Sequence, residues 1–72
     1  MTPTEISILN LLDQDPNSTL SELTSLIADE LNLSERKVRS ILESLERKNL
    51  VIIDDEIEMV MLSSKGSVLV RH

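Results

Sequence analysis

Two amphipathic stretches joined by a four-residue turn are the feature that most restricts how this chain can fold. The turn is Leu31-Asn32-Leu33-Ser34. Asn adopts the left-handed conformation that ends a helix more easily than most residues do, and a serine two positions later can cap the next helix. A β-rich segment, Leu50–Leu62, follows the second stretch. This order predicts a helix, a tight turn, a second helix and two short strands.

Helix-start signals add a further helix at the N-terminus. Thr2 and Glu5 have the spacing of a capping box, with a proline at the first helical position between them. The helix that ends at Asn32 has two candidate starts, Ser21 and a second capping box that begins at Thr19. The sequence therefore predicts three helices, near residues 3–13, 20–31 and 34–48.

The core of this chain must be aliphatic, because its 72 residues include no Phe, Trp or Tyr. Hydrophobic residues make up 40% of the chain, which is enough for a single small domain covering residues 1–72. Helical spacing predicts the following core residues: Ile6, Leu9, Leu23, Ile27, Val38, Leu42 and Leu45. The lack of aromatic residues also excludes modules that bind single-stranded nucleic acid by stacking its bases on aromatic rings.

The C-terminal third is rich in β-branched and aliphatic residues. Leu50–Ile53 and Ile57–Leu62 flank Asp54-Asp55-Glu56, which predicts a β-hairpin with an acidic tip. Lys65-Gly66 then predicts a turn, and Val68–Val70 is expected to form either a third strand or the start of a longer element.

These elements together give an α+β fold of the winged helix-turn-helix type, a three-helix bundle followed by a C-terminal β-hairpin wing. In that plan the helix after the tight turn is presented to a groove of nucleic acid. The charge distribution agrees in part. Residues 1–35 carry seven acids and no Lys or Arg, whereas residues 36–72 carry all seven Lys and Arg residues.

Nucleic-acid binding by this chain needs a local basic patch, because the net charge is −6. The basic residues begin at the start of the third predicted helix, on the side opposite its apolar face. Arginine there can donate two hydrogen bonds to a guanine edge, and serine lets the backbone come close. The candidate nucleic-acid-binding residues, for duplex DNA or tRNA, are Arg36, Lys37, Arg39, Ser40, Ser44, Arg47 and Lys65.

Two alternatives to that interpretation remain open. Glu43 is four residues from both Arg39 and Arg47, so local ion pairs would make this helix face an ordinary solvated surface. The acidic hairpin tip would be repelled by phosphates, which leaves a protein partner within a larger assembly as the second functional class.

The second strand of the hairpin is apolar on both faces, because Met59 and Met61 alternate with aliphatic residues. A strand with one wet face would alternate with polar residues. The predicted interface consists of Met59, Met61, Val68 and Val70, and its partner is a second copy of the chain or a domain of a longer parent chain.

Catalysis has no support in the sequence. The chain has no cysteine, one glycine, and a single histidine, His72, which is expected to be a frayed end. We therefore expect no enzyme activity, cofactor, metal site or small-molecule substrate. No membrane span or signal peptide is expected, and the expected location is cytoplasmic, or nuclear in a eukaryote.

The segment Leu31–Val51 resembles the recognition-helix region of many winged-helix proteins, in which L-G-L-S and L-E-x-K-G-L-V recur. Asn32 and Asn49 stand here at the two glycine positions. The acidic hairpin and Met61–Gly66 are also similar to the N-terminal winged-helix domain of the archaeal and eukaryotic phenylalanyl-tRNA synthetase alpha chain, where the step is V-x-L-T-x-x-G. That resemblance implies a tRNA-binding appendage remote from catalysis.

Overall fold

The computed structural model describes residues 1–15 and 18–70, and His72 lies outside them. Within these residues the chain forms three helices, a β-hairpin and a short fourth helix. The elements are α1 (Pro3–Gln14), α2 (Leu20–Leu31), α3 (Glu35–Arg47), β1 (Val51–Asp54), β2 (Met59–Leu62) and α4 (Ser64–Val70). The predicted order of three helices followed by a hairpin is confirmed.

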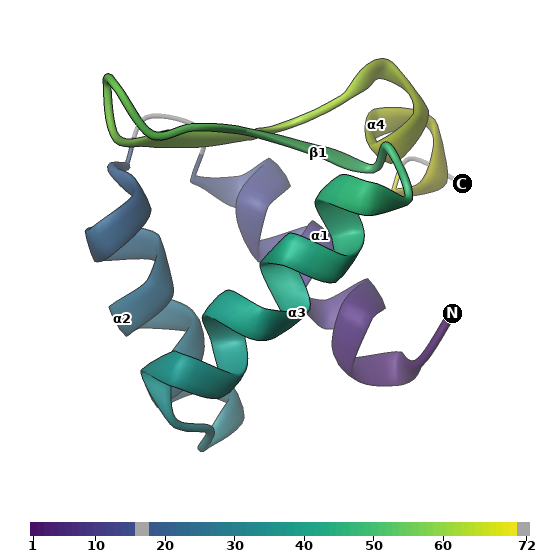
Figure 1. Ribbon diagram of the computed structural model, residues 1–72. Coiled ribbons are helices and arrows are strands. Elements are labelled where there is room, and N and C mark those ends of the chain that lie inside the picture. Colours follow the sequence, from purple (N-terminus) through teal and green to yellow (C-terminus); the bar gives the residue numbers. More distant parts are fainter. Residues whose placement is uncertain (16–17, 71–72) are drawn as a thin grey trace.

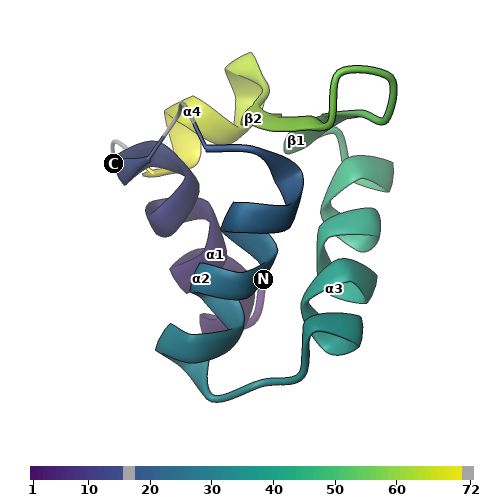
Figure 2. The same ribbon diagram turned by 90° about the vertical axis from the view of Figure 1, so that its left-hand side faces the viewer.

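The hairpin lies across one end of the helical layer, with α4 beside it (Figure 1). Figure 2 shows α1 and α2 on one side of the molecule and α3 on the other, with α2 and α3 joined at the end away from the hairpin. The two strands are antiparallel, with Val51 opposite Leu62 and Asp54 opposite Met59. The backbone N–H of Leu20 donates to the carbonyl of Glu58 at 2.8 Å, which ties the start of α2 to the hairpin.

The helix ends follow the capping signals in the sequence. Thr2 and Thr19 both form complete capping boxes, so α2 begins after Thr19 rather than at Ser21. Asn32 and Asn49 adopt left-handed conformations, with φ of 55° and 62°. The predicted role of Asn32 as a helix stop is confirmed, and Asn49 takes the same conformation just after the end of α3.

The core is aliphatic and draws on every element except α4. Six of the seven predicted core residues are buried, and Ile6 is not: its side chain is 44% exposed. The buried face of α1 is centred on Ile8, Leu9 and Leu12, and Ile6 lies about 110° around the helix from that centre. The buried hydrophobic residues are Ile8, Leu9, Leu12, Leu20, Leu23, Ile27, Ala28, Val38, Leu42, Leu45, Leu50, Val51 and Val60.

The hairpin turn is longer than predicted, and the second strand is shorter. Ile57 lies in the turn and is 62% exposed, and β2 begins only at Met59. The Asp54 side chain accepts a hydrogen bond from the backbone N–H of Glu56, and Glu58 has a φ of 54°. The Asp54 hydrogen bond and the positive φ of Glu58 hold residues 57 and 58 in the turn, although the apolar pattern predicted that they belong to the strand.

The predicted turn at Lys65-Gly66 and the third-strand alternative for Val68–Val70 are wrong, because these residues belong to a helix, α4. The hydroxyl of Ser63 accepts a hydrogen bond from the backbone N–H of Gly66 at 3.0 Å and starts the helical turn. α4 then packs against α1 and β2. Val68–Val70 are three consecutive apolar residues and do not show the spacing of three or four that marks a helix, so the sequence pattern favoured a strand.

Candidate nucleic-acid interface

α3 is fixed on one side and free on the other. The hydroxyl of Ser34 caps it by accepting from the backbone N–H of Lys37 at 3.1 Å. Val38, Leu42 and Leu45 are at most 1% exposed and hold the helix against the core. The remaining surface of α3 faces solvent, which is the placement required of a helix that enters a nucleic-acid groove.

An open groove of about 580 Å³ separates α3 from the first turn of α1. Its α3 wall brings together four of the predicted residues, Lys37, Ser40, Ser44 and Arg47. The rest of its lining consists of Thr2, Thr4, Glu5, Leu33, Ile41 and Lys48.

Lys48 is a groove residue that the sequence analysis missed. It follows Ser44 by four positions, so its helical spacing was the signal that could have found it. Its ammonium group donates to the carboxylate of Glu5, whose side chain is 10% exposed. This hydrogen bond from Lys48, with a further one from the backbone N–H of Thr2, lowers the pKa of Glu5 from 4.5 to about 2. Glu5 therefore stays ionised at neutral pH and holds Lys48 at the edge of the groove.

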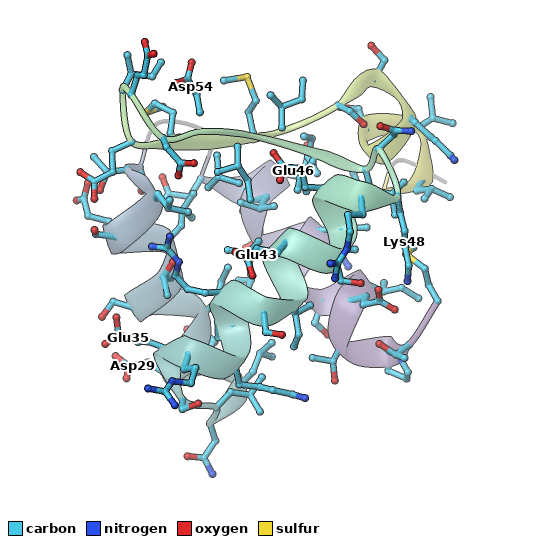
Figure 3. All side chains as sticks on the ribbon, viewed as in Figure 1. Asp29, Glu35, Glu43, Glu46, Lys48 and Asp54 are labelled. Atoms are coloured by element: carbon cyan, nitrogen blue, oxygen red, sulfur yellow. The ribbon has the colours of Figure 1, made fainter. Side chains whose placement is uncertain are left out.

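The opposite side of α3, toward the hairpin, carries acids. Figure 3 shows Glu43 and Glu46 on that side, whereas Lys48 lies above the first turn of α1. A small hollow of about 100 Å³ is lined there by Arg39, Glu43, Glu46 and Asp55, among others. The two sides of α3 thus differ in the sign of their charge.

The predicted site is only partly assembled in one place. Arg36 is exposed on α3 outside the groove, and Arg39 lies on the hairpin side. Lys65 is exposed on α4, which packs against α1 and β2, so the structure does not bring it to the groove. Whether any of these side chains binds nucleic acid stays a prediction.

The four predicted interface residues also have separate placements. Met61 and Val68 are exposed, at 40% and 57%, whereas Met59 and Val70 are half-buried. The outer face of the hairpin is therefore apolar and open to solvent, and its role as an interface stays a prediction.

The ion pairs that would neutralise α3 are not formed. In the described part of the chain, the salt bridge found is that between Lys48 and Glu5. Glu43 pairs with neither Arg39 nor Arg47 within 4.0 Å in that part. The arginines of α3 thus keep their charge available for a partner.

A family model of winged helix-turn-helix DNA-binding domains matches residues 1–52. This chain belongs to that family. Its fold class, an α+β winged helix, is therefore confirmed, and the family's activity is DNA binding rather than catalysis. No curated protein sequence is a significant match to the chain.

One solved structure is similar to this winged helix over nearly its whole length. It is the transcriptional repressor CouR, bound to p-coumaroyl-CoA, with 28% sequence identity and a TM-score of 0.80. The match covers 99% of this chain and 49% of the repressor, so the chain spans about half the length of that protein. None of the three comparisons supports the resemblance to a tRNA synthetase.

Other kinds of site find no support in the described residues. Residues 1–15 and 18–70 contain no cluster of His, Cys, Asp and Glu that could hold a metal ion. Over the same residues, no helix is long and apolar enough to cross a membrane.

Proposed function

We propose that this winged helix binds duplex DNA through the exposed face of α3 and serves as the DNA-binding part of a transcription regulator. The observation that carries this proposal is the set of exposed basic residues on α3 without an ion-pair partner in the described chain. Arg36 and Lys37 lie in the first turn, the part of a recognition helix that approaches base edges. Ser40 is exposed and small enough to allow close approach.

The similarity to a transcriptional repressor supports the regulatory part of the proposal. A net charge of −6 makes binding depend on the local basic surface on and beside α3, since the acidic remainder of the domain repels phosphate. Affinity should therefore fall steeply with salt, and substitutions on α3 should remove most of it.

The test is the double variant Arg36→Ala, Arg39→Ala, measured by fluorescence anisotropy on a mixed-sequence DNA duplex over a range of salt. We expect the double variant to bind the duplex more weakly. The slope of the logarithm of the binding constant against the logarithm of the salt concentration should become less negative by about 0.9 for each phosphate contact that is lost. The matched control is Asn10→Glu with Gln14→Glu, which changes the net charge by the same amount on the exposed side of α1.

Circular dichroism should show that both variants remain folded. Equal affinity of the arginine variant and the wild type would exclude Arg36 and Arg39 as DNA contacts and would overturn binding through the first two turns of α3. If the wild type binds no DNA duplex even at low salt, docking to a protein partner replaces DNA binding as the proposed function. If the wild type binds tRNA more tightly than a DNA duplex, tRNA replaces DNA as the proposed ligand.

A further inference from the structure

The groove between α1 and α3 has a positive charge balance. Lys37, Arg47 and Lys48 line it, and the one carboxylate in its lining belongs to Glu5. Glu5 is already engaged by Lys48 at 2.7 Å and by Thr2 at 2.9 Å, and it is nearly buried. A phosphate that entered the groove would therefore meet Lys37 and Arg47, which have no ion-pair partner among residues 1–15 and 18–70, and the half-exposed Lys48.

The groove also supplies neutral hydrogen-bond donors. The hydroxyls of Thr4, Ser40 and Ser44 are part of its lining, and they can donate to phosphate oxygens. Arg47 can donate two parallel hydrogen bonds to one phosphate. The groove is open to solvent rather than enclosed, so the phosphates of a DNA backbone can reach its lining.

The hairpin has the opposite character. Asp54, Asp55, Glu56 and Glu58 are exposed at its turn, and Glu43 and Glu46 face it from α3. No Lys or Arg lies in residues 49–64, so no cation of the hairpin offsets these carboxylates. Repulsion between these carboxylates and phosphates decays over about 8–10 Å at ordinary salt, so it disfavours a DNA backbone placed within about that distance of this edge.

We propose that this domain seats one strand of the DNA backbone in the groove between the first turn of α1 and α3, and that its hairpin stands clear of the DNA. The proposal rests on the proposed function and specifies the side of α3 that meets the backbone. The acidic hairpin then disfavours DNA at its own edge, and the α1–α3 groove supplies phosphate contacts in addition to those of Arg36 and Arg39 on α3.

Substitutions at Thr4 test the groove without touching α3. Thr4 lies in the first turn of α1, where an acid is tolerated or favourable for the helix, so Thr4→Glu should fold at least as well as the wild type. We expect Thr4→Glu to weaken binding to a mixed-sequence duplex by about fivefold at low salt and Thr4→Lys to strengthen it. The control Asn10→Glu, with the same charge on the exposed side of α1, should stay within about twofold.

A cross-linking experiment tests the orientation directly. The chain has no cysteine, so single-cysteine variants can carry a photoactivated cross-linker at one defined position. We expect cross-links to DNA from Thr4→Cys in the groove and none from Asp55→Cys at the hairpin. A cross-link to DNA from the Asp55→Cys variant would overturn the proposal, whether or not the Thr4→Cys variant also cross-links. A Thr4→Cys variant that gives no cross-link to DNA would overturn it as well.

The two proposals fail in different ways. If Thr4→Glu and Thr4→Lys bind like the wild type while Arg36→Ala, Arg39→Ala binds weakly, DNA binding by α3 stands and the groove is excluded. If the wild type does not bind duplex DNA, both proposals fall together.

Discussion

Lys48 Nζ lies 2.7 Å from Glu5 Oε2, which ties the residue that caps α3 to the first turn of α1 across 43 positions of sequence. Glu5 also closes the capping box of α1, where its carboxylate accepts from the backbone N–H of Thr2. The same carboxylate thus starts one helix and fixes the end of another. Among the residues that the structure describes, Glu5 and Thr24 are the two polar residues in an otherwise apolar buried set.

Acid should weaken the fold through Glu5. Its pKa in the folded state, about 2, lies below the ordinary value of 4.5. The stabilisation is therefore complete above pH 4.5 and is lost as the pH falls toward 2. Denaturant unfolding at a series of pH values should show a decreasing free energy of unfolding across that interval, and a smaller decrease in Glu5→Gln.

Glu22 offers a matched control at neutral pH, because it closes the same kind of capping box on α2 without a lysine partner in the described chain. We expect Glu5→Gln to lower the Tm more than Glu22→Gln does. Equal Tm values for the two variants would show that the capping box alone accounts for the role of Glu5.

The sequence predicts those parts of the fold that depend on interactions between residues close together in the chain. Asn32 and the two capping boxes act on their own helix, and their signals lie within a few residues. The ion pair of Glu5 and Lys48, by contrast, joins residues whose proximity depends on how α1 packs near α3. Sequence spacing carries no information on that packing, so the groove and its α1 wall could not be predicted, although four residues of its α3 wall were already candidates for nucleic-acid binding.

Asn32 should tolerate glycine better than alanine. Its φ of 55° and ψ of 49° place it in the left-handed region, where a Cβ atom clashes with the following carbonyl. We expect Asn32→Ala to lower the free energy of unfolding by about 1 kcal/mol and Asn32→Gly to leave it within about 0.5 kcal/mol. Urea titration of the two variants measures the difference, and an equal effect of both would contradict a conformational origin.

Gly66 should resist replacement for a steric reason. A Cβ atom at this position would lie 2.1 Å from the carbonyl oxygen of Leu50, a backbone atom that also accepts from Ser63. We expect Gly66→Ala to lower the free energy of unfolding by about 2 kcal/mol. Ser67→Ala, the next position on α4, should change it by less than about 0.5 kcal/mol. A Gly66→Ala variant as stable as Ser67→Ala would show that α4 is not held against Leu50 in solution.

The outer face of the hairpin should mediate self-association. Ile52 and Met61 are directly opposite each other and 49% and 40% exposed, whereas Val60 on the inner face is 1% exposed. An apolar cross-strand pair in solvent favours contact with a second apolar surface. We expect the wild type to associate at millimolar concentration in sedimentation equilibrium and Met61→Lys to remain monomeric, with a free energy of unfolding within about 0.5 kcal/mol of the wild type.

Ile57→Lys is the matched control for that experiment, because Ile57 is 62% exposed in the turn, away from the paired strands. It adds the same charge to the hairpin, so it should reduce association by charge repulsion alone and much less than Met61→Lys does. Equal losses in the two variants would mean that charge, not the apolar face, controls association. A wild type that is monomeric at both micromolar and millimolar concentration would show that the exposed face of the hairpin has no partner in a second copy of this chain.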